Sequence, residues 1–550
     1  MKNVIISIYY AFLTIFILSS NEYLYQKVDF VYDGEIKSQI TAKASSLPDK
    51  WYDKVVFYEL FVREFLDTDG DGAGDFNGVI KKLDYLKELG IGAIWLMPVT
   101  ESDDNDHCYS VIDYFNVETD YGTMSDFDNL ISEAHKRGIA IIMDLVINHC
   151  SSNHPFFASA NESVESRYRD WFIWSEKRYE WYSFEDPLVF PKKYYNWDEI
   201  NDNSFNWHRG KNGDYYFGLF YSGMPDFNYR NEEVYQYFKD VITFWLNKGV
   251  DGFRIDAARH IVENGKNKLS DQPETYDVFK GFRKVLDKFD NRYIIGEADN
   301  IQYLGDGEDC LKSIFYFDFA LKTSSAIYNE DTTELIETIR KLQIRPEGSI
   351  ISNVLSCHDS YLGARPATRL KTIENSKVAA SVLLLLPDSP YIYYGDEIGM
   401  KNSGRYDGDW ALRSPMQWDG SKNAGFTSAK KPYGRKVNRG YKRINVEKSI
   451  KNDDSIYNHY KNVISVRNSH SSLQKGKIEF LEFDKRVLSF VRFNDEERIY
   501  VHINLSAKDI KLDFPSADKQ ILFGAKDFYE QNEKIVIKGK KTLIFKKLYE

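Results

Sequence analysis

The sequence predicts a (β/α)8 TIM barrel that carries a small inserted domain after its third strand and is followed by a C-terminal antiparallel β domain. Three observations lead to this α/β fold class. Short apolar runs alternate eight times with helix-like segments between Val55 and Tyr394, which is typical of a parallel sheet covered on both faces. The alternation stops between Asn148 and about Asn228, and after about Gln474 the apolar residues follow a period of two.

Each of the eight predicted strands is short and apolar, as expected for strands buried on both faces. They are Val55–Val62, Ile91–Val99, Ile139–Val146, Val250–Ile255, Tyr293–Gly296, Ser313–Phe319, Ile350–Leu355 and Pro390–Tyr394. Helical periodicity between them is clearest over Gly78–Leu89, Asp126–Arg137, Glu232–Lys248 and Tyr276–Phe289, and Gly138 is suited to end the second of these helices. Eight such units predict a closed barrel.

The first residues are typical of an export signal. Lys2 precedes an apolar run from Val4 to Leu18, followed by two serines. The run is short for a membrane-spanning helix, but no Ala-x-Ala cleavage site is evident, so an uncleaved anchor stays open. We expect a secreted, periplasmic or cell-surface protein that contacts a membrane only if this segment is uncleaved. Residues 1–20 are then signal peptide or anchor, and residues 21–50 a linker.

The rest of the chain divides into three predicted parts. The barrel takes residues 51–148 and 229–470, the inserted domain takes 149–228, and a β-sandwich takes 471–550. A structureless insert of that length is implausible, so we expect it to fold. The insert holds Trp171, Trp174, Trp181, Trp197 and Trp207, which either stack on a ligand or pack against the barrel. The sandwich strands are predicted at Ile478–Phe483, Val487–Phe493, Arg498–Ile503, Ile510–Phe514 and Lys534–Phe545.

Composition excludes some classes of protein. The net charge is −11 and no long basic run occurs, which argues against nucleic acid as a partner. The four cysteines, at 108, 150, 310 and 357, match no metal or redox spacing. We expect free buried thiols, although a disulfide in an oxidising compartment stays open.

An acidic, glycine-rich loop follows the first predicted strand. Asp67, Asp69, Asp71 and Asp75 stand close together around glycines, and four such carboxylates repel one another unless a cation binds. An EF-hand would need Glu at the twelfth position, where Gly78 stands. We interpret the loop as a calcium-type site outside the EF-hand pattern, in preference to a solvated acidic turn.

Acids and histidines also follow four of the predicted barrel strands, at the end where barrel enzymes place their sites. The third strand leads to His149, the fourth to Asp256, the fifth to Glu297, and the seventh to His358 and Asp359. Packing alone does not explain this convergence, because buried like charges are costly. Two carboxylates of different protonation state with a third acid are what glycoside hydrolysis needs.

Arg254 is two residues from Asp256, so both side chains lie on the same side of a strand. The cation should keep Asp256 ionised, as a nucleophile requires. A neighbouring carboxylate should in turn keep Glu297 protonated near neutral pH.

These four stretches resemble the signature regions of the alpha-amylase superfamily, glycoside hydrolase family 13, and the resemblance runs from about Trp51 to the C-terminus. Met224–Asn228 resembles the fifth region of the family, and Tyr394–Gly399 and Ser414–Asp419 resemble other family stretches. The fifth region is most similar to the group intermediate between oligo-1,6-glucosidases and neopullulanases. The resemblance implies a retaining hydrolase of α-1,4-glucosidic bonds in starch or maltooligosaccharides.

The same resemblance implies roles for individual residues. Asp256 is the expected nucleophile, Glu297 the general acid/base and Asp359 the stabiliser of the transition state. The expected substrate-binding residues are Tyr109, His149, Arg254, His260 and His358, while Asp144 mainly holds the architecture. A structural Ca²⁺ is expected on the side chains of Asp67, Asp69, Asp71 and Asp75 and the carbonyl of Ala73. The protein is expected to be a monomer.

Three departures from the family pattern bear on specificity. Cys357 stands where Asn usually precedes His-Asp, and Cys108-Tyr109-Ser110 stands where many members have Gly-Tyr-Asp. Ser110 weakens an exo-glucosidase interpretation, and Ala257 departs from the Val that 1,6-specific members tend to carry after the nucleophile.

The alternatives within the family are an oligo-1,6-glucosidase, a neopullulanase-like enzyme and a trehalose synthase. A membrane-anchored, amylase-like transporter subunit is the non-enzyme alternative. Such chains tend to lose the acids that Asp256, Glu297 and Asp359 preserve here.

Overall fold

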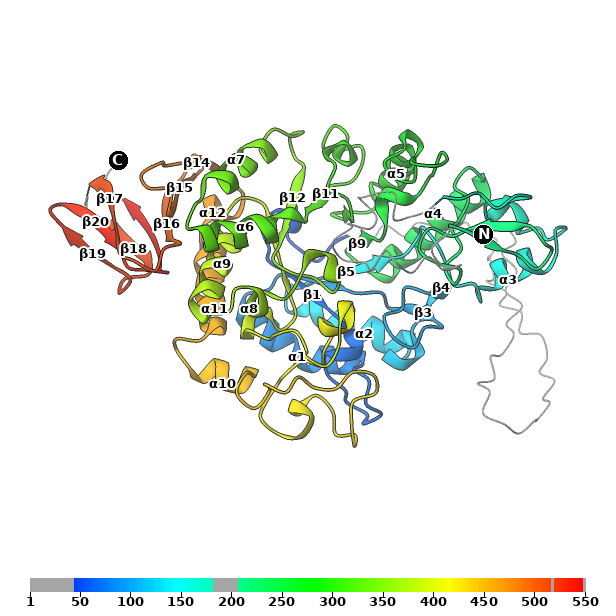
Figure 1. Ribbon diagram of the computed structural model, residues 1–550, viewed down its shortest axis with the longest axis horizontal. Helices are drawn as coiled ribbons and strands as arrows, with labels where there is room; N and C mark the ends of the chain where they lie inside the picture. The colour runs from blue at the N-terminus through cyan, green and yellow to red at the C-terminus, as the bar shows by residue number, and fades with distance from the viewer. Residues whose placement is uncertain (1–43, 182–205, 516–518, 548–550) are drawn as a thin grey trace.

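The computed structural model describes residues 44–181, 206–515 and 519–547 of the chain (Figure 1). The predicted signal segment, most of the predicted linker and Trp197 therefore lie outside the described residues. Within the described part, no helix is both long enough and apolar enough to cross a membrane.

Eight parallel strands close into a barrel in the order β1-β13-β12-β11-β10-β9-β5-β2, at the centre of Figure 1. All eight correspond to the predicted strands, and nearly all of their residues are buried. Closure depends on β1 pairing with β13, in which Phe57 lies opposite Tyr391. The strands are β1 (Phe57–Leu60), β2 (Ala93–Leu96), β5 (Ala140–Leu145), β9 (Gly252–Ile255), β10 (Tyr293–Gly296), β11 (Ser313–Tyr316), β12 (Ile350–Val354) and β13 (Ser389–Tyr393).

A ring of helices covers the outside of the barrel (Figure 1). Local sequence defines their ends: Thr123 and Asp126 form a capping box at the start of α2, and α1 ends at Gly90 in the left-handed conformation. The longer helices are α1 (Phe76–Leu89), α2 (Met124–Lys136), α4 (Glu232–Lys248), α5 (Pro273–Leu286), α6 (Asp318–Asn329), α7 (Thr333–Leu342), α9 (Ile373–Leu385) and α11 (Ile456–Ser469). The shorter ones are α8 (Pro366–Arg369), α10 (Val446–Lys451) and α12 (Ser471–Lys475).

Two excursions extend from the barrel mouth. A hairpin of β3 (Thr100–Ser102) and β4 (Val111–Val117), which the sequence pattern did not predict, carries Tyr109 in its turn. The insert after β5 contains α3 (Pro155–Glu162) and a small sheet of β6 (Trp174–Ser175), β8 (Tyr215–Phe217) and β7 (Trp207–Arg209). Trp171 is fully buried against Tyr237 of α4, so this tryptophan packs the insert onto the barrel.

The C-terminal domain is formed by two antiparallel sheets, ordered β14-β15-β16-β21-β18 and β17-β20-β19. The predicted single segment from Lys534 to Phe545 is two strands in different sheets, because a turn at Gly539 and Lys540 separates them. The strands are β14 (Lys477–Phe480), β15 (Val487–Phe493), β16 (Arg498–Asn504), β17 (Ile510–Pro515), β18 (Lys519–Phe523), β19 (Phe528–Gln531), β20 (Lys534–Ile537) and β21 (Thr542–Lys547).

Candidate active site

One buried guanidinium joins three carboxylates at the carboxyl ends of the barrel strands. Nη1 of Arg254 lies 2.7 Å from Oδ1 of Asp256 and 2.8 Å from Oδ1 of Asp144. Its Nη2 lies 2.8 Å from Oε2 of Glu297. Because β5, β9 and β10 are neighbours in the sheet, residues distant in sequence meet around a single cation. Asp256 and Glu297 are therefore brought together, as the sequence predicts.

The chain bends sharply just after Asp256. Ala257 has a φ of 46°, and its amide donates to Oε2 of Glu297 at 2.8 Å. The other Glu297 oxygen accepts from the Tyr361 hydroxyl at 3.3 Å. These two hydrogen bonds, together with Arg254, fix the orientation of the Glu297 carboxyl group.

His358 connects this carboxylate cluster to the first strand of the barrel. Its Nδ1 lies 2.6 Å from Oε1 of Glu59 on β1, and its Nε2 lies 2.6 Å from the Tyr109 hydroxyl and 3.2 Å from Oδ2 of Asp359. Burial raises the pKa of Glu59 well above its ordinary value and lowers the pKa of His358 well below its own. Burial thus favours the uncharged forms of both partners.

Tyr109 comes from the β3–β4 turn and lies inside the cluster. Its ring stacks on His358 with centroids 5.6 Å apart, and its hydroxyl donates to Oδ2 of Asp144 at 3.0 Å. The hairpin therefore supplies one wall of the site.

Asp359 has a cationic partner that the sequence analysis missed. Nη2 of Arg413 donates to Oδ1 of Asp359 at 2.8 Å, and Nε donates to the His358 carbonyl at 3.0 Å. Asp409 accepts a bond from the Ser360 amide at 2.7 Å and lies 3.4 Å from Arg413. Only its position in the sequence could have pointed to Arg413, because it immediately precedes Ser414–Asp419, which resembles a stretch of the family.

Burial raises the pKa values of Asp144, Asp256 and Asp359. The pKa of Asp256 is well above its ordinary value because burial and the charges of Glu297 and Asp144 outweigh Arg254. Burial raises the pKa of Asp144 to about 6, and burial with Asp409 raises the pKa of Asp359 to about 7. The expectation that Arg254 keeps Asp256 ionised stays a prediction: Arg254 lowers the pKa of Asp256, but three carboxylates share that single cation.

The two remaining predicted histidines lie on either side of Phe220, a residue of the insert that the sequence analysis missed. The Phe220 ring is 5.1 Å from His149 and 6.4 Å from His260. The buried Nε2 of His149 has no hydrogen-bond partner among the described residues, and burial lowers the pKa of this histidine to about 3. Nδ1 of His260 lies 2.8 Å from the Leu269 carbonyl. A neutral, unpaired ring nitrogen suits a hydroxyl group of a substrate.

The acidic loop lies between β1 and α1, apart from this cluster in the sequence. Carboxylate oxygens of Asp67, Asp69 and Asp71 lie within 4.8 Å of one another, which fits a hard cation. Asp75 is engaged differently: it is the N-cap of α1 and accepts from the Gly78 amide at 2.7 Å. The amide of Ala73 donates to Oδ1 of Asp71 at 2.7 Å. Three of the four predicted aspartates therefore form one group.

All four cysteines are buried and free, so none forms a disulfide. Cys357 accepts a hydrogen bond on Sγ from the Asp359 amide at 3.3 Å and so shapes the loop that holds this acid. Cys108 has a φ of 64° and lies beside Tyr109 in the hairpin turn.

A family model described as the alpha-amylase catalytic domain matches residues 59–476, which is most of the chain. The chain belongs to the alpha-amylase family of glycoside hydrolases. It is 36% identical over 508 residues to alpha-amylase 3 of Dictyoglomus thermophilum, covering 90% of this chain and 94% of the relative. It is 31% identical over 527 residues to an oligo-1,6-glucosidase of Parageobacillus thermoglucosidasius, covering 83% and 91%.

Solved structures of family members have the same architecture. An alpha-amylase from H. orenii superposes with a TM-score of 0.75 at 31% identity, covering 90% of this chain and 99% of that one. An isomaltulose synthase from Erwinia rhapontici superposes with a TM-score of 0.78 at 26% identity, covering 91% and 99%. The relatives thus share one scaffold but carry names for different activities.

Proposed function

We propose that this glycosidase cleaves α-1,4-glucosidic bonds in maltooligosaccharides or starch by double displacement. The observation that carries the proposal is the single buried Arg254 shared by Asp256, Glu297 and Asp144. It brings two carboxyl groups from adjacent strands close together, and a retaining glycosidase needs its two acids about 5–5.5 Å apart.

In the proposed mechanism, Asp256 attacks the anomeric carbon of the sugar while Glu297 gives its proton to the departing glycosidic oxygen. A covalent glycosyl ester forms on Asp256, and the leaving sugar departs with the proton. Glu297 then takes a proton from water, and this water breaks the ester with net retention of configuration. Asp359, held by Arg413, is placed to bind sugar hydroxyls, and the free Nε2 of His149 offers another contact.

Electrostatics limits how many carboxylates of this cluster can be charged at once. Asp144, Asp256 and the partly exposed Glu297 share one cation, and burial raises the pKa values of Asp144 and Asp256. A site that holds one carboxyl group protonated and another ionised can supply both acid and nucleophile. If a bound sugar displaced one of the other carboxylates from Arg254, this cation would interact more strongly with Asp256 and stabilise its ionised form.

The preference for α-1,4 bonds rests on specific residues and relatives. Ser110 occupies the position where many exo-acting members have Asp, and Ala257 departs from the Val of many 1,6-specific members. Relatives named alpha-amylase are similar over most of the chain. A trehalose synthase/amylase of Mycobacterium tuberculosis is 34% identical to this chain over 501 residues. This relative makes isomerisation or glucosyl transfer the second candidate activity.

Product analysis separates these candidates. Wild type should convert maltoheptaose to shorter maltooligosaccharides and leave isomaltose intact, with no trehalose formed from maltose. The Glu297→Gln variant should lose this activity while keeping its fold. Unchanged hydrolysis of maltoheptaose by Asp256→Asn would remove the nucleophile assignment, whereas absence of hydrolysis by the wild type would favour the transporter-subunit interpretation.

We also propose that Asp67, Asp69 and Asp71 hold a structural Ca²⁺, with Asp75 fixing the adjacent helix. The Thr427 hydroxyl and the Gly72 amide both donate to Oδ2 of Asp67, which ties the loop to a distant segment. Chelation should lower the melting temperature by roughly 5 °C, as expected for loss of a bound ion, without abolishing hydrolysis at low temperature. Asp71→Asn should already have the lower melting temperature and no longer respond to chelator. An identical response in the variant would show that the ion binds elsewhere.

Export by the N-terminal segment and a monomeric state complete the proposal. N-terminal sequencing of the protein recovered from its native compartment tests whether residues 1–20 are removed. Light scattering on a size-exclusion column tests the monomer.

A further inference from the structure

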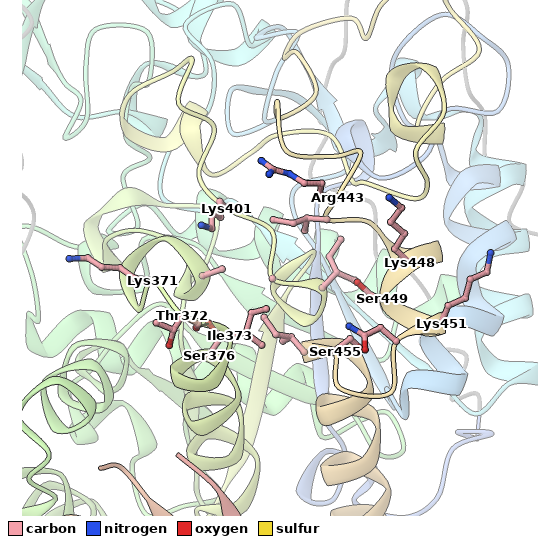
Figure 2. A pocket seen from close by; sticks show the side chains of 16 residues that line it. Lys371, Thr372, Ile373, Ser376, Lys401, Arg443, Lys448, Ser449, Lys451 and Ser455 are labelled. Atoms are coloured by element: carbon pink, nitrogen blue, oxygen red, sulfur yellow. Dashed lines mark hydrogen bonds between the residues drawn. The ribbon is translucent and has the colours of Figure 1, made fainter. Parts of the chain in front are cut away.

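A cavity of about 580 Å³ lies among the loop after β13, the start of α9 and the helices α10 and α11 (Figure 2). It shares no residue with the carboxylate cluster. Its buried floor is apolar, formed by Ala367, Ile398, Gly399 and Ile456. A cavity of this size can hold a small organic molecule.

Among the residues that the structure describes, five cations and no carboxylate line this cavity, although the whole chain has a net charge of −11. Figure 2 shows Lys371, Lys401, Arg443, Lys448 and Lys451 around the rim. All five side chains are exposed, so together they present positive charge to an approaching anion.

Two of the five cations are already engaged. Lys451 pairs with Glu447 at 2.6 Å, and Lys448 donates to the Lys442 carbonyl at 2.8 Å. Lys371, Lys401 and Arg443 have no ion-pair partner within the described part of the chain. These three come from separate segments, so the fold itself gathers them.

Two helices present their positive ends to the same cavity. Thr372, the N-cap of α9, and Ser455, the N-cap of α11, both line it. The backbone dipole of each helix adds partial positive charge at its N-terminus. No aromatic side chain lines the cavity, so it lacks the stacking surface that an uncharged sugar would use.

We propose that this cavity binds a small organic phosphate. The phosphate group would contact Lys371, Lys401 and Arg443, and the organic part would cover the apolar floor. A polynucleotide fits less well, because three cations around the mouth of one cavity match a compact anion better than an extended backbone.

Calorimetry on the full chain in a phosphate-free buffer tests the proposal with adenosine monophosphate, adenosine and inorganic phosphate as probes. We expect one monophosphate per chain and no binding of adenosine. The triple variant Lys371→Gln/Lys401→Gln/Arg443→Gln should weaken binding by about tenfold or more, since charge-assisted hydrogen bonds are lost.

A matched triple variant controls for general charge. Lys430→Gln/Lys436→Gln/Arg439→Gln removes the same number of charges from exposed positions, none of which lines the cavity. It should bind the monophosphate within twofold of wild type, and both triples should keep wild-type hydrolysis of maltoheptaose. Absence of monophosphate binding to wild type, binding of inorganic phosphate alone, or equal loss in the two triples would each overturn the proposal.

Discussion

Replacing Arg254 with Gln tests the central feature of the active site. The change keeps a side chain of similar reach but removes the one cation shared by Asp256, Glu297 and Asp144. A pair of charge centres about 4 Å apart interacts by about 4 kcal/mol at an effective dielectric constant of 20. Losing an interaction of that size in the transition state corresponds to a fall in kcat/KM of about 10³-fold.

The sign of the pH effect follows from the same contacts. Arg254 opposes the raised pKa of Asp256, so removing it raises this pKa further. The acidic limb of the pH–activity profile should therefore move to higher pH, which a merely unfolded fraction of protein would not produce. Initial rates on maltoheptaose between pH 4 and 9 provide both kcat/KM and the position of the acidic limb.

Arg292→Gln is the matched control. Arg292 is also buried but precedes β10 at the opposite end of the barrel, where it lies 3.4 Å from Asp251. Its loss should lower stability and leave kcat/KM and the pH profile close to wild type. The reasoning would be refuted if Arg254→Gln kept kcat/KM within tenfold of wild type, or if both variants lost activity equally.

Three further outcomes follow from the structure. The pKa of Asp359, about 7 when folded, exceeds its unfolded value, so its stabilising contribution is full below about pH 4 and is lost as pH rises through 7. Urea titration should therefore show that the free energy of unfolding of wild type falls by roughly 2–4 kcal/mol more than that of Asp359→Asn between pH 4 and 7.5. The same pH dependence of this free energy in both proteins would contradict the reasoning. Trp171→Ala should lower the free energy of unfolding by about 3–5 kcal/mol in the same assay, because the ring is fully buried between the insert and the barrel. A decrease below about 1 kcal/mol would show that the insert is not packed there. Gly72→Ala should distort the acidic loop, because Gly72 has a φ of 105° and an added Cβ would lie 2.9 Å from the Tyr433 nitrogen. The variant should therefore lose the change in melting temperature on addition of chelator. An unchanged response would place the ion outside this loop.

The barrel could be predicted because each of its strands is an apolar run between polar helices, a pattern that survives without any knowledge of contacts. The residues at the strand ends followed from the barrel geometry. The β18 and β19 strands were missed because their residues are half-buried or exposed and give no clear period-two signal.

Partners distant in sequence were the other failure. Arg413 and Phe220 lie in loops, and nothing in their local sequence indicates that one holds Asp359 and the other lies between His149 and His260. The surroundings of Asp256 were only partly predicted for the same reason: adjacency to Arg254 was visible, but the two other carboxylates on that guanidinium were not.

The pairing of Phe57 with Tyr391 has a consequence for biogenesis. During synthesis the first barrel strand leaves the ribosome long before its neighbour β13 exists, so the sheet keeps two open edges until about seven tenths of the polypeptide has emerged. Unpaired strand edges make a nascent chain in that state prone to aggregation. Any truncation before Ser389 should yield insoluble protein rather than a smaller working enzyme.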